Sequence, residues 1–143
     1  MQPFDYDEAL EEVLKKDNRY DQGAYHFVRE ALDYTQVVIA RKTGDKEPRH
    51  ITGQELLGGI RDHALETFGP MVLAVLNEWG VHRCEDFGEI VFNLVENHLL
   101  AKTDQDNRSD FENGYDFEEV FQKPFLPKSA STKKQPSRKA EKN

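Results

Sequence analysis

The histidines and carboxylates of the chain are the first residues to test for a metal site. Helical di-iron sites use Glu-x-x-His, a spacing that places both ligands on one face of a helix. The helices expected from this sequence lack that order, and His63 precedes Glu66 instead. His82 and Cys84 lie two residues apart, but no further ligand nearby completes the tetrahedral set that zinc requires. We therefore predict no bound metal and no cofactor.

Cys84, the one cysteine of the chain, is the candidate nucleophile. A place at the start of an expected helix, beside His82 and Arg83, would lower the pKa of its thiol. Glu85 and Asp86 oppose that effect, and no strand-turn-helix elbow surrounds the residue. We interpret Cys84 as structural and predict that the protein is not an enzyme. The enzymatic alternative requires one polar cleft that joins His63, Glu66, His82 and Cys84.

Residues 70–100 contain two apolar helical runs joined at Gly80, as in a helix-turn-helix. A DNA-reading second helix presents basic or amide side chains to the bases and cations to the phosphates. The predicted solvent side of the second run carries carboxylates instead, among them Glu85, Asp86, Glu89 and Glu96. Because carboxylates repel a polyanion, we interpret the two runs as packed core helices.

Start and stop signals define the elements that must position these side chains. Asp5 with Glu8 has the spacing of a helix cap, and Asp21 can cap a second helix that ends at Gly44. The second helix has apolar side chains at intervals of three and four over more than four turns. These are Ala24, Phe27, Val28, Ala31, Leu32, Thr35, Val38 and Ile39.

Thr52 and Glu55 give the clearest helix start, a capping box. Gly58 and Gly59 inside this helix each cost about 1 kcal/mol relative to alanine, so we expect a neighbouring helix to cross closely there. Gly69-Pro70 ends this helix and begins the next. The last long helix starts near Cys84–Glu85, with an apolar stripe at Phe87, Ile90, Val91, Leu94, Val95 and His98. The sequence therefore predicts an all-α bundle of about five helices.

The segment DFENGYDFEEVFQKPF combines acidic residues with large aromatic rings. We expect a short helix near 116–122. The segment could dock into a groove on a partner, or its rings could pack back over the helical body. Both interpretations remain open at this point, and the candidate residues are Phe111, Tyr115, Phe117, Phe121 and Phe125.

Charge divides the chain at residue 122. Residues 123–143 carry seven basic residues and one acid, a charge of +6, whereas residues 1–122 carry 12 basic and 26 acidic residues, a charge of −14. The proline-rich tail has too few apolar residues to fold, so we predict a disordered tail at 123–143 behind an acidic domain at 1–122. Basic tails attract nucleic acid. The candidate contacts are Lys133, Lys134, Arg138 and Lys139.

No apolar run approaches the roughly 18 residues of a membrane span. The acidic N-terminal stretch MQPFDYDEALEEVLKK has no resemblance to a signal peptide. A single cysteine also excludes an internal disulfide framework. We expect a cytoplasmic protein without a membrane partner.

The block HITGQELLGGIRDHALETFGPMVLAVLNEWGVHRCEDFGEIVFNLVE, with RYDQGAYHFVREALDYTQ before it and YDFEEVF after it, resembles a family of small bacterial proteins of unknown function. The resemblance covers roughly residues 15–122. It implies a bacterial, cytoplasmic, single-domain protein and transfers no catalytic residue.

These observations together predict a non-enzymatic module that binds another protein, with the aromatic C-terminal segment as a docking element. The alternative is association with nucleic acid or the ribosome through the basic tail.

Overall fold

The computed structural model describes residues 6–44, 51–100 and 108–127, and all regular structure in these ranges is helical. The prediction of an all-α bundle is confirmed. Its α-helices are α1 (Tyr6–Lys16), α2 (Gln22–Thr43), α3 (Gly53–Phe68), α4 (Val72–Trp79) and α5 (Cys84–Glu96). Short helical turns complete the described chain at η1 (Gly69–Met71), η2 (Arg108–Phe111), η3 (Glu118–Gln122) and η4 (Lys123–Phe125).

The predicted caps of α2 and α3 form as local hydrogen bonds. Asp21 Oδ2 accepts from the backbone N–H of Gly23 at 2.8 Å, and Gly44 ends α2 in the left-handed region with φ of 77°. Thr52 and Glu55 close the capping box, because each side chain accepts from the other's backbone N–H, at 3.0 and 3.1 Å. The predicted cap at Asp5 lies outside the described residues.

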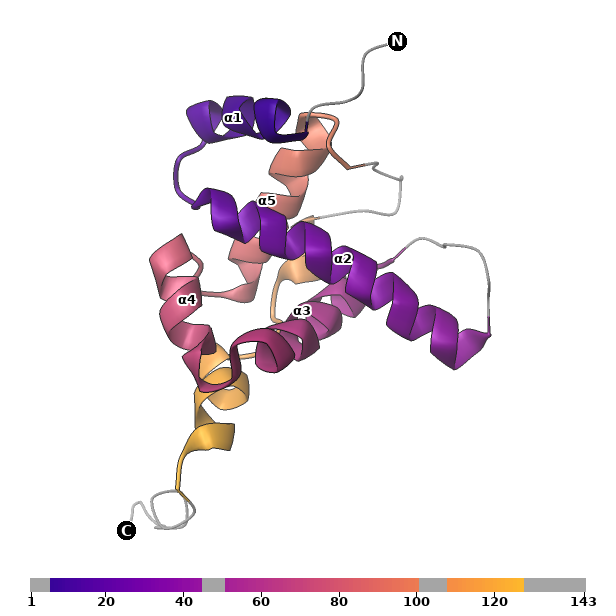
Figure 1. The fold of residues 1–143 in the computed structure, drawn as a ribbon, viewed down its shortest axis with the longest axis vertical. Helices are drawn as coiled ribbons and strands as arrows, with labels where there is room; N and C mark the ends of the chain where they lie inside the picture. The colour runs from indigo at the N-terminus through magenta and orange to yellow at the C-terminus, as the bar shows by residue number, and fades with distance from the viewer. Residues whose placement is uncertain (1–5, 45–50, 101–107, 128–143) are drawn as a thin grey trace.

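The long helix α2 runs through the middle of the molecule (Figure 1) and packs against α3, α4 and α5. α3 lies antiparallel to α2, and α1 covers α5 at one end of the body. The C-terminal turns η3 and η4 lie at the opposite end, below α4. The last turns of α2 extend outward past the other described helices, and residues 41–44 are exposed.

The core is apolar and draws on every α-helix. α5 is buried on more than one side, as expected, because Phe92 is buried together with Phe87, Ile90 and Leu94 of its main stripe. Side chains far apart in the sequence meet here. The largest fully buried ones are Tyr25, Phe87, Phe121, Leu10, Leu57, Ile60, Leu76, Ile90 and Leu94.

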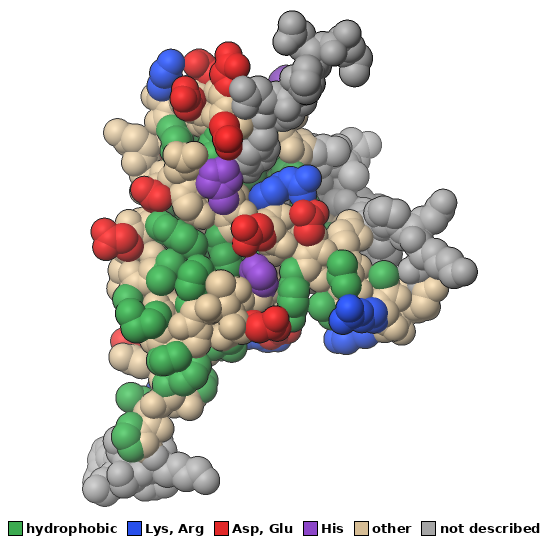
Figure 2. Space-filling view, viewed as in Figure 1, with side chains coloured by type: hydrophobic (Ala, Val, Ile, Leu, Met, Phe, Trp, Pro, Cys, Tyr) green, Lys and Arg blue, Asp and Glu red, His purple; other side chains and the backbone are tan. Residues whose placement is uncertain are grey.

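The surface is uneven in charge. Carboxylates gather over α1 in Figure 2, where Asp7, Glu8, Glu11 and Glu12 are exposed. Hydrophobic side chains gather in the same view where α4 meets the C-terminal turns. Among the described helices, none combines the length and the apolar character needed to cross a membrane.

Regular structure continues for a few residues past the boundary that the sequence predicts at residue 122. We expected the tail to begin at residue 123, but Lys123–Phe125 forms η4 and continues directly from η3. The salt bridge between Lys123 and Glu119, one turn apart, links the two turns. The rest of the predicted tail, residues 128–143, lies outside the described residues.

Candidate functional site

α2 and α3 touch most closely at Thr35 and Gly59. A Cβ atom on Gly59 would lie 1.7 Å from Thr35 Oγ1, a separation that only glycine allows. Thr35 is buried, and its hydroxyl donates to the carbonyl of Ala31 at 2.7 Å. Beside this crossing the two antiparallel helices enclose a groove of about 340 Å³.

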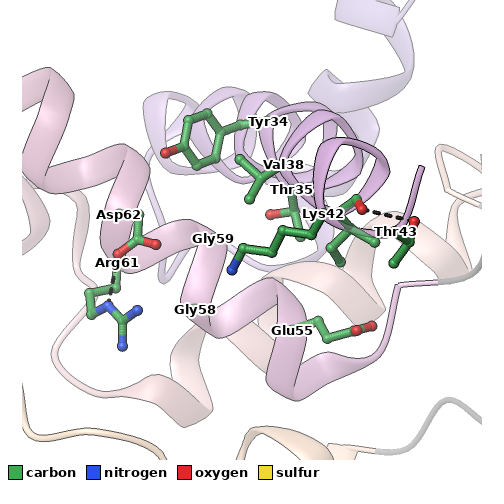
Figure 3. Close-up of a pocket in the computed structure, with 11 residues that line it drawn as sticks. Tyr34, Thr35, Val38, Lys42, Thr43, Glu55, Gly58, Gly59, Arg61 and Asp62 are labelled. Atoms are coloured by element: carbon green, nitrogen blue, oxygen red, sulfur yellow. Dashed lines mark hydrogen bonds and ion pairs between the residues drawn. The ribbon is translucent and has the colours of Figure 1, made fainter. Parts of the chain in front are cut away.

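The floor of the groove is apolar and its rim is polar (Figure 3). Val38 and Ile39 of α2 are half-buried and form the apolar floor of the groove, which Gly58 of α3 also lines. The Lys42 side chain extends from α2 across the groove toward the turn of α3 that holds the two glycines. Lys42 is exposed and has no ion-pair partner among the described residues.

The opposite end of the groove holds Arg61, Asp62 and Tyr34. Arg61 Nε donates to Asp62 Oδ1 at 3.0 Å, and this hydrogen bond raises the pKa of the guanidinium. The Tyr34 ring packs on the His63 ring, with centroids 5.1 Å apart. The Arg61–Asp62 charges are therefore already paired. The Glu55 carboxylate, which also lines the groove, accepts from the Thr52 backbone N–H at 3.0 Å. Lys42 is the groove charge that is left for a ligand among the described residues.

Gly58 differs from its neighbour Gly59. A Cβ atom on Gly58 would meet nothing within 4 Å, so helix packing does not require glycine there. We predicted that both glycines mark a close helix crossing, and the structure confirms this for Gly59 alone. Gly58 lines the open groove instead. A glycine without a packing role keeps a groove clear and lets another backbone approach.

The predicted aromatic residues are mostly parts of the core. Phe111, Phe117 and Phe121 are buried, and Phe117 and Phe121 meet edge to face with ring centroids 5.3 Å apart. Tyr115 donates its hydroxyl to the Leu57 carbonyl at 2.7 Å, and burial raises the pKa of this phenol.

The exception among the five aromatic residues is Phe125, which is 45% exposed. The segment therefore packs back over the helical body, one of the two interpretations left open by the sequence. Docking of these rings on a partner stays a prediction. The four candidate tail residues Lys133, Lys134, Arg138 and Lys139 lie outside the described residues.

Two of the carboxylates expected on the solvent side of α5, Asp86 and Glu89, face partners inside the protein. Asp86 accepts from the Tyr20 hydroxyl at 2.7 Å and from the backbone N–H of His82 at 2.8 Å. Glu89 lies 3.3 Å from Arg19 and 3.2 Å from Arg108. This face of α5 is thus occupied by the loop between α1 and α2 and by η2.

Asn93 extends this polar network one turn further along α5. Its Nδ2 donates to the Tyr25 hydroxyl at 2.9 Å and to Asp17 Oδ2 at 3.0 Å. Arg19 holds the same carboxylate of Asp17 at 2.6 Å, and this hydrogen bond keeps the pKa of Asp17 well below its usual range. The network is a structural one, because each of its charges has a partner within the body.

The residues of the enzymatic alternative make separate contacts. Cys84 is buried, its thiol donates to the Tyr115 carbonyl at 3.4 Å, and burial raises its pKa to about 11. The His63 ring is stacked between Phe27 and Tyr34, with its Nε2 3.5 Å from a Glu30 carboxylate oxygen.

The other histidine of that alternative, His82, is exposed and contacts Asn77 Oδ1 at 3.1 Å. The described residues include no cluster of three or more potential metal ligands. The groove between α2 and α3 combines a cavity, an apolar floor and an unpaired charge.

The chain matches no family model, no curated protein and no solved structure. Membership of a family of small bacterial proteins therefore stays a prediction.

Proposed function

We propose that the protein is a non-enzymatic interaction module that binds another protein in the groove between α2 and α3. The observation that carries the proposal is the pairing of an apolar floor at Val38 and Ile39 with an unpaired rim cation at Lys42. The ionisable side chains that come together around α5 are held in structural pairs instead.

We predicted from the sequence that the aromatic C-terminal segment is the docking element. The buried state of Phe117 and Phe121 favours a different surface for the interaction, because a core residue reaches a partner only if the segment detaches. The groove needs no such rearrangement. Preformed surfaces bind with less loss of entropy than surfaces that must first unfold.

The test is affinity purification from the native cell with the full-length chain as bait. Val38→Glu places a carboxylate in the groove floor, and Val37→Glu is the matched control, because Val37 is the adjacent residue and does not line the groove. We expect a discrete set of proteins that Val37→Glu retains and Val38→Glu loses. Recovery of no protein above the tag alone would contradict the proposal.

A second candidate function is nucleic-acid or ribosome association through residues 123–143, favoured by the charge of +6 on that segment. Its test is a salt titration of RNA binding with the full-length chain and with a truncation after residue 127. Equal binding by the two proteins would refute it.

We also propose that the protein is bacterial and lies in the cytoplasm. The support is the use of a single cysteine, typical of a reducing compartment, and the resemblance to small bacterial proteins. Fractionation of the native cell tests this location, and recovery of the protein outside the cytoplasmic fraction would contradict it.

A further inference from the structure

The groove between α2 and α3 has a shape and a charge that restrict what can fill it. Its walls are two antiparallel helices, and its lining covers roughly two to three turns of each, from Tyr34 to Thr43 and from Glu55 to Asp62. Its volume of about 340 Å³ lies at the low end for small-molecule pockets, and Lys42 and Thr43 at its rim are exposed. An open, elongated, apolar groove of this kind suits the face of a helix better than an enclosed small molecule.

Charge selects among the helices that could enter. The body carries a charge of −14, yet the groove presents Lys42 as its unpaired charge in the described structure. A carboxylate on the incoming helix would pair with this ammonium, whereas a basic segment would be repelled by it. The chain's own basic tail is thus a poor occupant, and the yellow C-terminal turns that precede it lie apart from the last turns of α2 in Figure 1.

Gly58 gives an independent sign of an occupant. Glycine inside a helix lowers stability by about 1 kcal/mol relative to alanine, and nothing in the described fold offsets that cost at this position. Its bare backbone faces the groove, where a side chain would occupy the space that an incoming helix needs.

Resting on the proposed function, we infer that the groove binds an amphipathic helix of a partner protein. Aliphatic side chains of that helix lie on Val38 and Ile39, its backbone passes close to Gly58, and one of its carboxylates pairs with Lys42. The partner is thus identified by its chemistry: an acidic amphipathic helix with aliphatic anchors at positions i, i+3 or i+4, and i+7.

The probe for this inference is a displayed library of helical peptides, randomised at the anchor positions and at the flanking solvent positions, selected against the full-length protein. We expect enriched peptides to carry aliphatic anchors and at least one Asp or Glu. Val38→Glu should weaken peptide binding about tenfold or more, because it puts a carboxylate in the apolar floor of the groove. A tenfold loss of affinity corresponds to about 1.4 kcal/mol of binding free energy. Val37→Glu should leave binding within about twofold.

Two further substitutions test the charge and the glycine separately. Lys42→Met keeps most of the side-chain length and removes the charge. It should weaken peptide binding about fivefold, the effect expected for the loss of one exposed ion pair, and it should reduce the salt dependence of binding. Arg41→Met is the matched control, because Arg41 lies on the same turn and does not line the groove. Gly58→Gln should abolish binding while the chain stays folded, because its side chain projects into open space.

Several results would overturn the inference. The selection could enrich no peptide, or it could enrich peptides that lack a carboxylate. Peptides could also bind equally well to the wild type and to Val38→Glu, Lys42→Met and Gly58→Gln. A dimer that Val38→Glu dissociates would make a second copy the occupant and would also overturn it. Peptides that bind elsewhere on the body refute the groove as the site but not the interaction module, which the affinity purification tests separately.

Discussion

The adjacent glycines of α3 predict opposite responses to the same substitution. In Gly58→Ala the new Cβ atom meets nothing within 4 Å, so the gain in helix propensity of up to about 1 kcal/mol appears as added stability. In Gly59→Ala the new Cβ atom lies 1.7 Å from Thr35 Oγ1 and 2.9 Å from Thr35 Cβ. Because Thr35 is buried, it cannot move aside without displacing α2.

The size of the Gly59→Ala effect follows from two opposed contributions. Overpacking a well-packed site costs typically 1–3 kcal/mol, and a contact this short belongs near the upper end of that range. Subtracting the propensity gain leaves a loss of roughly 2 kcal/mol. The two variants should thus differ by roughly 3 kcal/mol in free energy of unfolding, or about 6–12 °C in melting temperature for a chain of this size.

The assay is urea unfolding of the full-length chain followed by far-UV circular dichroism. Both variants should keep the wild-type slope of free energy against urea, since neither changes the surface exposed on unfolding. Thr35→Ala in the Gly59→Ala background should recover about 1 kcal/mol or more, as expected for residues in direct contact. Equal shifts in the two glycine variants, or independence from Thr35, would refute the close crossing of α2 and α3.

The remaining predictions concern the core, the polar network and the thiol. Phe121→Ala should lower the free energy of unfolding by about 3–5 kcal/mol in a thermal unfolding experiment, because its side chain is 1% exposed. Phe125→Ala should change it by no more than about 0.5 kcal/mol. Similar losses for both variants would contradict the packing of this segment against its own helical body. The hydrogen bond from Arg19 holds the pKa of Asp17 below its ordinary 3.8, so the ionised carboxylate stabilises the fold above that pH and this contribution is lost as the pH falls. Asp17→Asn should therefore lower the free energy of unfolding at neutral pH and flatten the acid limb of the stability curve. An unchanged acid limb would contradict this prediction. Cys84 should react with a thiol reagent only after denaturation, and full reaction of the native chain would show that the thiol is accessible.

The sequence predicts the local features of this fold well. Caps such as Asp21 and the Thr52–Glu55 pair depend on hydrogen bonds within four residues, so their spacing is visible in the chain itself. Gly44 and Gly80 end α2 and α4 with positive φ, a conformation in which glycine carries no steric cost. These signals need no knowledge of what lies across the core.

Tertiary contacts set the features that the sequence did not predict. The stripe predicted for α5 included His98, but the helix ends at Glu96 and His98 is exposed with φ of 63°. Glu89 was expected to face solvent, but it forms ion pairs with Arg19 and Arg108. Helical periodicity cannot predict either contact, because both arginines lie outside α5. A residue's own position in a helix does not reveal which distant segment will cover it.

The groove was missed for the same reason, although two signals were present in the sequence. Gly58 and Gly59 were both assigned to one crossing, because a sequence cannot show which of two neighbouring glycines faces the other helix. Val38 was assigned to the core stripe of α2, but Thr35 is the last buried residue of that stripe, and of the two later members only Ile39 packs against the core. Beyond it the helix extends past the body, and its apolar side chains line the open groove.

The most direct test of the account is photo-crosslinking in the native cell. A photoreactive amino acid replaces Thr43 at the groove rim in one protein and Met71, which is 58% exposed on η1, in the other. The account predicts a discrete crosslinked partner protein from position 43 that Val38→Glu abolishes, and none from position 71. Crosslinks from position 71 alone, or crosslinks from position 43 that survive Val38→Glu, would contradict the groove as the binding site.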